Sequence, residues 1–159
     1  MAVWQYDLHL VPLDQSGVDP RGYRFLPDGT LDIDPLSCHG VVPDSLPEFL
    51  GNALGPSCIL FRGIRSWGAG AGNRVDVCSS AEGLVENVFV RIDARSPSRT
   101  FMSLLVSMAN NLGCSFLDPL TRRVIRADSS ALEEALVTSR ATLFCRDPEG
   151  FIKDLASGA

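Results

Sequence analysis

A strict alternation of apolar and polar side chains at the start of this 159-residue chain limits the folds open to it. In residues 3–11, Trp4, Tyr6, Leu8 and Leu10 occupy every second position, with polar residues between them. A two-residue period puts one set of side chains on each face of a β-strand, so this segment predicts a strand that is covered on one face. Three further segments rich in β-forming residues predict strands at 58–67, 74–78 and 84–95.

The later part of the chain changes from the strand period to the helical one. Ser96 is a good N-cap and Pro97 suits the first helical position. Apolar residues then recur at helical spacing as far as Leu112, which predicts a helix with one apolar stripe. A short strand pair near 114–117 and 122–126 and two more helices, starting near 128–130 and near 147–148, are expected after it.

The order of these elements indicates the fold class. Strands come first, then a helix, a strand pair and more helices, without the regular strand–helix alternation of a parallel sheet. We therefore expect a single α+β domain over residues 1–159. Its sheet should be antiparallel, with about four to six strands and with helices packed mainly on one face.

Residues 13–57 form an acidic, proline-rich segment. They hold seven acidic residues and two arginines, which accounts for the whole formal net charge of −5. Within the segment, 23–31 predicts a short hairpin with a Pro-Asp-Gly turn, and 44–54 predicts a short helix. We interpret it as a loop-rich insertion whose acidic surface would repel nucleic acid and attract a basic protein. The sequence leaves open whether this segment covers the polar face of the sheet.

Charge and cysteine content exclude several classes of function. A pI of about 4.9 is far from the basic surface of a nucleic-acid-binding protein. The longest uncharged run, 49–61, is too short to cross a membrane, and Asp7 and His9 interrupt the apolar start that a signal peptide would need. The five cysteines form no Cys-x-x-Cys pair, and with the two histidines they give no metal-ligand spacing. We therefore expect a cytoplasmic protein with no metal, cofactor, nucleic-acid or membrane partner.

The polar face of the predicted sheet is the candidate functional surface. Arg74-Val75-Asp76 and Arg91-Ile92-Asp93 each place an arginine and an aspartate two residues apart on one face. If Asp76 lies opposite Arg91, then Arg74 lies opposite Asp93 and unlike charges meet across the strands. A shift of two residues would instead place Arg74 opposite Arg91.

This charged face predicts a non-catalytic protein-binding module, because arginine and aromatic side chains are typical anchors at interfaces. The hypothesis requires the side chains of Asp76, Phe89 and Arg91 to be exposed. The residues expected to contact the partner protein are Asp7, His9, Trp67, Arg74, Asp76, Phe89, Arg91 and Asp93.

Two alternatives remain open. A small enzyme would use Cys78 as nucleophile and His9 as acid or base, which requires strands 3–11 and 74–78 to be neighbours in the sheet. A homodimer would form through an uncovered edge or face of the sheet, with no other partner.

Three stretches of the chain resemble small uncharacterised bacterial proteins. They are Trp4-Gln5-Tyr6-Asp7, the pair Arg74-Val75-Asp76-Val77 and Val90-Arg91-Ile92-Asp93, and Arg146-Asp147-Pro148-Glu149-Gly150-Phe151. Some proteins of this size and α+β character are immunity proteins, which neutralise toxins. The resemblance implies a bacterial, cytosolic and non-catalytic protein with an immunity-type role, and it brings no catalytic residues with it.

Overall fold

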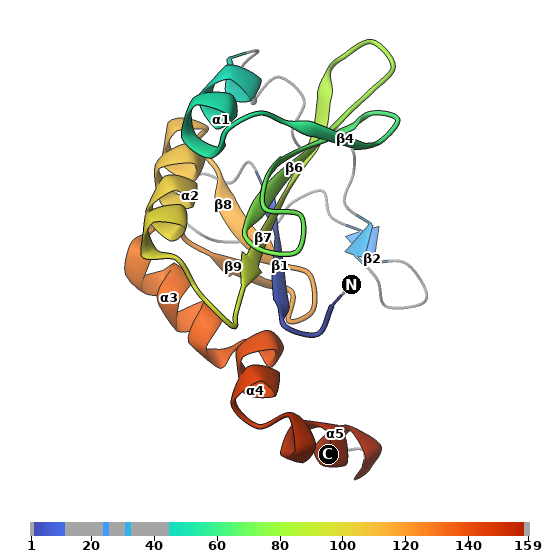
Figure 1. Cartoon of the computed structure of the whole chain (residues 1–159), viewed down its shortest axis with the longest axis vertical. Helices are drawn as coiled ribbons and strands as arrows, with labels where there is room; N and C mark the ends of the chain where they lie inside the picture. Colours follow the sequence, from blue (N-terminus) through green and yellow to red (C-terminus); the bar gives the residue numbers. More distant parts are fainter. Residues whose placement is uncertain (1, 12–23, 26–30, 33–44, 158–159) are drawn as a thin grey trace.

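The chain folds into an antiparallel sheet with helices on one side of it (Figure 1). The computed structural model describes residues 2–11, 24–25, 31–32 and 45–157. Over these residues it contains five helices and one large sheet of seven strands, which confirms the predicted α+β class. The sheet has one strand more than the upper end of the expectation, because 58–67 forms two strands instead of one.

The large sheet has the strand order β4-β5-β6-β7-β1-β8-β9, and each neighbouring pair is antiparallel. Its strands are β1 (Gln5–Val11), β4 (Cys58–Phe61), β5 (Ile64–Gly68), β6 (Arg74–Ser79), β7 (Val85–Asp93), β8 (Ser115–Asp118) and β9 (Arg123–Ile125). The first strand of the chain therefore lies inside the sheet, between β7 and β8.

A separate two-stranded ladder lies in the segment predicted to be a loop-rich insertion. It pairs β2 (Arg24–Phe25) with β3 (Leu31–Asp32) in antiparallel fashion, as the expected hairpin requires. The turn predicted between them, and most of the acidic segment, lie outside the described residues. The expectation about whether that segment covers the sheet therefore also lies outside the described residues.

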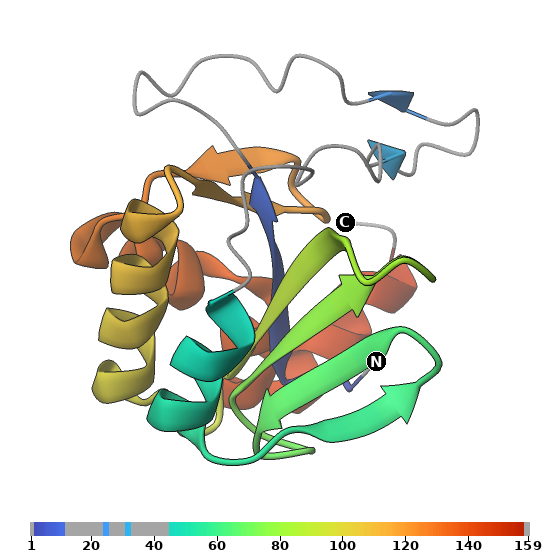
Figure 2. The same ribbon diagram turned by 90° about the horizontal axis from the view of Figure 1, so that it is seen from above.

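Helices cover the apolar face of the sheet, with α1 against β5, α2 against β8 and α3 against β9 (Figure 2). A short helix α4 touches β1, and α5 extends from it at the lower end of Figure 1. No helix within the described ranges is long and apolar enough to cross a membrane. The helices are α1 (Leu46–Leu54), α2 (Arg99–Asn111), α3 (Ser129–Thr138), α4 (Arg140–Arg146) and α5 (Pro148–Ser157).

The start of α2 differs by two residues from the expected position. Ser98, not Ser96, is the N-cap, and its Oγ accepts a hydrogen bond from the backbone N–H of Phe101 at 3.2 Å. A helix begins wherever a side-chain oxygen can reach the unpaired N–H groups of its first turn, so two serines this close give the sequence no means of choosing between them.

The core lies between the apolar face of the sheet and the helices. The alternation predicted for the strands is observed: the side chains pointing toward the helices are almost completely buried. They are Tyr6, Leu8 and Leu10 of β1, Val75 and Val77 of β6, and Val88, Val90 and Ile92 of β7. Leu50 of α1, Leu105 of α2 and Leu132 of α3 pack into the same cluster with no exposed surface. The C-terminal part of the predicted insertion, α1, is thus part of the core.

A tight turn at Arg62 and Gly63 divides the segment 58–67 into β4 and β5. Gly63 has a φ of 83°, a conformation that costs other residues about 1–2 kcal/mol. A Cβ atom at this position would lie 2.8 Å from the carbonyl oxygen of Ser79, whose N–H donates to the Gly63 carbonyl at 2.7 Å. Both the backbone conformation and the close approach of β6 therefore require glycine here.

We expect Gly63→Ala to destabilise the protein more than Gly83→Ala does. Gly83 has nearly the same φ, 86°, but nothing lies within 4 Å of a Cβ placed there. Both substitutions should cost about 1 kcal/mol through the backbone conformation, and Gly63→Ala should cost more because the Ser79 carbonyl must move. Urea unfolding of both variants measures the difference. Equal losses would show that the close contact with Ser79 is relaxed at no cost.

Candidate functional site

The charged face of the sheet has a different strand register from the one expected. Arg74 lies opposite Arg91, and Asp76 lies opposite Phe89, so the predicted pairing of Asp76 with Arg91 is wrong by two residues. The register places Val75 opposite Val90 and Val77 opposite Val88 on the apolar face. A shift of two residues leaves every side chain on the same face, so burial of the apolar side chains is nearly the same in both registers and the turn between β6 and β7 sets the pairing.

The two arginines that face each other are each neutralised by a different aspartate. Arg91 donates to Asp7 of β1 twice, from Nε at 2.5 Å and from Nη2 at 3.3 Å. The Nε atom of Arg74 lies 3.0 Å from Oδ2 of Asp76 on the same strand, and its Nη1 donates to the carbonyl oxygen of Gly70 at 2.8 Å. The row of charges therefore balances itself within the sheet.

Asp93, which was expected to face Arg74, turns to the loop after its own strand. Arg95 donates to it from Nε at 2.9 Å and from Nη2 at 2.7 Å. These bonds hold the pKa of the Asp93 carboxyl below its ordinary value. The guanidinium of Arg95 also stacks over the Trp4 ring, 4.6 Å from its centre.

The face that these ion pairs form is less exposed than the binding hypothesis requires. Asp76 and Asp93 are buried, each with 8% of its surface exposed, so the expectation of an exposed Asp76 is wrong. The remaining members on this face are half-buried, and their role in binding a partner stays a prediction; they are Asp7, His9, Arg74, Phe89 and Arg91.

Trp67 lies on the opposite face from the one predicted. It pairs with Val75, whose side chain points toward the helices, and directly opposed residues share a face. Trp67 is 3% exposed and belongs to the core, where its Nε1 lies 4.0 Å from a Cβ placed on Gly51 of α1. Residues 58–67 were expected to form one strand, and the turn that divides them into β4 and β5 changes which face Trp67 occupies.

The pair proposed for an enzyme, His9 and Cys78, is not brought together. Their strands, β1 and β6, are separated by β7, and Cys78 lies two residues along β6 from the position level with His9, so the two residues are more than two strand spacings, over roughly 10 Å, apart. The His9 ring instead packs edge-on against Phe89, with ring centres 4.6 Å apart. Burial lowers the pKa of His9 to about 4 and raises the pKa of the Cys78 thiol, to which Glu86 adds. An activated thiolate would need the opposite shift at the cysteine.

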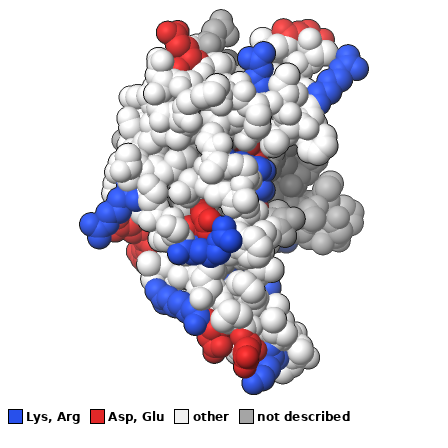
Figure 3. All heavy atoms as spheres, in the orientation of Figure 1, with Lys and Arg blue, Asp and Glu red and all other residues white. Residues whose placement is uncertain are grey.

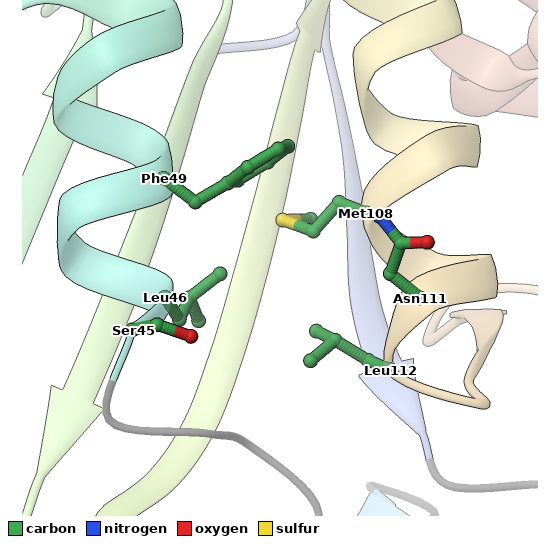
Figure 4. A pocket seen from close by; sticks show the side chains of 6 residues that line it. All are labelled: Ser45, Leu46, Phe49, Met108, Asn111 and Leu112. Atoms are coloured by element: carbon green, nitrogen blue, oxygen red, sulfur yellow. The ribbon is translucent and has the colours of Figure 1, made fainter.

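Two hollows in the described part of the chain were considered as ligand sites. The one between α1 and α2 has a volume of about 130 Å³; Phe49 and Met108 point toward each other across it (Figure 4). That volume is below the 300–1,000 Å³ of typical ligand pockets, so we interpret it as a packing gap. A larger hollow of about 610 Å³ lies beside Trp4 and α4. Arg95 lines this hollow, and its guanidinium is already paired with the carboxylate of Asp93. Among the described residues no group of three or more metal-ligating side chains occurs.

An exposed apolar edge strand is the surface feature that sequence analysis missed. All four residues of β4 are exposed, with 74% of Ile59 and 72% of Phe61 accessible. Leu84, in the neighbouring turn between β6 and β7, is 54% exposed. A run of four apolar residues is typical of a strand buried on both faces, so the sequence pattern pointed away from this result. We call this strand, Cys58–Phe61, the β4 edge.

The molecular surface over helices α1 and α2 carries few charges. In Figure 3 the face over α1 and α2 is largely free of charged side chains, which gather toward α4 and α5 and along the upper rim. Helices α1 and α2 contain one charged residue each, Glu48 and Arg99. Depletion of charge is typical of the central part of protein–protein interfaces.

We expect His9 to make the folded protein less stable as the pH falls from 7 to 5. Its pKa of about 4 lies below the ordinary 6.5, so the unfolded chain takes up a proton that the folded chain does not. This stability is present above pH 6.5 and is lost as the pH falls toward 4. The loss between pH 7 and pH 5 should be on the order of 1–2 kcal/mol, measured by urea unfolding.

The control for that measurement is His9→Gln, which removes the titrating group from between Asp7 and Phe89. Carboxylates with lowered pKa values, such as Asp93, are present in both proteins and contribute equally. The pH dependence between 7 and 5 should be smaller in the variant. An unchanged pH dependence would mean that folding does not shift the pKa of His9.

We also expect Cys58 to be alkylated faster than the other cysteines of the described ranges. It is exposed, whereas Cys78 and Cys145 are half-buried with raised thiol pKa values, and Cys114 is buried. Iodoacetamide treatment near neutral pH, followed by mass spectrometry of each peptide, measures the rates. Cys78 should react more slowly than free cysteine, and a faster reaction would restore the enzyme hypothesis.

Comparison of the chain with protein-family models, with curated proteins and with solved structures finds no match. The feature that the described side chains single out is the β4 edge.

Proposed function

We propose that this chain is a non-catalytic protein-binding module and that the β4 edge is its binding surface. The observation that carries the proposal is an outer strand whose four residues are exposed and uncharged, with Ile59 and Phe61 each more than 70% accessible. Outer strands of stable proteins are normally protected by charges, proline or a covering segment. An unprotected apolar edge is typical of a site where another chain binds.

The opposite edge of the same sheet supports this interpretation by contrast. Strand β9 has three residues and carries the exposed Arg123 within it, whereas β4 has no charged residue among its four. Positive charges along an edge discourage another strand from pairing there. The two edges of this sheet therefore differ in the charge within the outer strand, which influences whether another strand can pair there.

The charged face is a weaker candidate for the binding surface. Its arginines already pair with Asp7 and Asp76, and Asp76 is buried. A partner would have to break these ion pairs and desolvate both charges in order to use them, which usually cancels the gain from new contacts. The edge strand offers apolar side chains and backbone groups without that cost.

The wider role stays a proposal from the sequence. The resemblance to small bacterial proteins is consistent with an immunity-type role in the cytosol, in which this chain would bind and neutralise a toxin. The net charge of −5 of the whole chain, most of whose source lies outside the described residues, would suit a partner that is basic overall; it does not define the charge of the segment that contacts the β4 edge. The alternative is a second copy of the chain bound at the β4 edge. The sedimentation measurement described below distinguishes a second copy from a different protein.

The test compares capture by the wild-type chain with capture by a double variant, Ile59→Lys with Phe61→Lys. Lysines on the edge should abolish binding of any protein that packs against it, because each would bury a charge. The matched control is Ile152→Lys with Leu155→Lys on α5, whose side chains are 58% and 54% exposed. Bound proteins are identified by mass, and the wild type and the α5 variant should retain the same partner.

Both variants should unfold within about 0.5 kcal/mol of the wild type, since all four positions lie on the surface. A partner retained by the folded β4 variant would show that the edge is not the binding surface. Loss of the partner in both variants would show that the effect comes from added positive charge rather than from the edge.

A further inference from the structure

We infer that the partner binds as an extended strand paired to the β4 edge, with carboxylate side chains that meet Arg62 and Arg65. This inference rests on the proposed function and adds the conformation and the charge of the bound segment. It combines three features of this edge: unpaired backbone groups, apolar side chains and two arginines without acidic neighbours.

The backbone of β4 provides the first feature. The strand pairs with β5 on one side only, and it is the last strand in the order of the sheet. Its outward N–H and C=O groups are therefore free of ladder partners among the described residues. Added strands use such groups, and the main-chain hydrogen bonds supply affinity that does not depend on sequence.

The side chains on the two faces of the hairpin provide the second feature. Ile59 lies opposite Arg65 on one face, and Phe61 lies opposite Ile64 on the other, with an irregular step in the pairing between them. A strand added beside β4 would alternate in the same way, with one row of its side chains near Ile59 and the other near Phe61. The first row would also lie within reach of Arg65, and the second would lie near Ile64.

The charges around the edge provide the third feature. No acidic residue occurs in the sequence from Phe49 to Val75, which includes the whole β4–β5 hairpin. Arg62 and Arg65 are exposed, and among the described residues neither forms an ion pair. On the adjoining hairpin, Asp76 lies opposite Ser66 but forms its ion pair with Arg74, and neither Glu82 nor Glu86 is paired with these arginines in the described ranges. Two unpaired arginines beside an apolar strand favour a partner that carries carboxylates.

The same charges make a second copy of the chain a poorer occupant. Two β4 edges paired with each other would bring four arginines, Arg62 and Arg65 from each copy, to one interface without a carboxylate from either hairpin. Like charges brought together at an interface lower affinity. An acidic extended segment of another protein fits the edge without that repulsion.

The experiment uses the full chain and three acetylated, amidated eight-residue peptides. Their sequences alternate valine with glutamate, with glutamine or with lysine, so that one face is always valine and the other changes only in charge. Binding is measured by isothermal titration at low salt and at about 0.5 M salt, where exposed charges are screened. The glutamate peptide should bind at least about tenfold more tightly than the lysine peptide, and salt should reduce the difference.

Two controls separate the parts of the inference. Arg62→Gln with Arg65→Gln should make the three peptides bind equally, while leaving the apolar contacts intact. A glutamate peptide that carries N-methyl groups on every second residue, tested in both registers, should bind in at most one of them, because methylation removes the donors of one edge. Protection of Cys58 from alkylation by the bound peptide would place it on β4, since this thiol is exposed in the free chain.

Each remaining outcome overturns a defined statement. Equal binding of the glutamate and lysine peptides would overturn the charge preference, and normal binding of both methylated peptides would overturn strand pairing. A wild-type chain that sediments as a dimer, while Ile59→Lys with Phe61→Lys sediments as a monomer, would show that a second copy occupies the edge. If no peptide binds at millimolar concentration but the β4 variant still loses its captured partner, the inference fails and the proposed function stands.

Discussion

The pairing of β1 with both β7 and β8 is the constraint on which the rest of the structure depends. Strands β4 to β7 form a series of consecutive hairpins, and β8 and β9 form another; within the sheet, β1 joins the two. The ion pair between Asp7 and Arg91 links β1 to β7, and the hydroxyl of Tyr6 donates to the buried carboxylate of Asp118 on β8 at 3.2 Å. Because β1 is distant in sequence from both of its neighbours, the two parts of the sheet join only when long-range contacts form.

This central position explains why the two faces of the sheet differ. The alternate apolar residues of the inner strands face the helices, and the residues between them carry charges that pair across or along the strands. Because these pairs satisfy one another, the charged face does not need a partner to neutralise it. Backbone groups without a ladder partner lie at the ends of the sheet, where a strand has a neighbour on one side only.

The ends of the sheet are not equivalent, and their difference supports the functional proposal. Strand β9 is short and contains the exposed Arg123, whereas β4 presents Ile59 and Phe61 to solvent with no charge within the strand. Helices α1 and α2 continue this region as a surface with few charges. An edge that supplies backbone hydrogen bonds, apolar contacts and two arginines nearby has what strand addition requires, without a cavity or a reactive group.

The sequence by itself determined the α+β class, the positions of most elements and the side chains that face the core, because period-two and helical spacings are local properties of the chain. It did not determine the turn at Gly63, the register that places Arg74 opposite Arg91, or the burial of Trp67 and Asp76. These depend on which strands become neighbours and on the turns that set their register, which local spacing does not show. Only the tertiary structure decided that β4 is an outer strand, because an apolar run looks the same in sequence whether it lies in the middle of a sheet or at its edge.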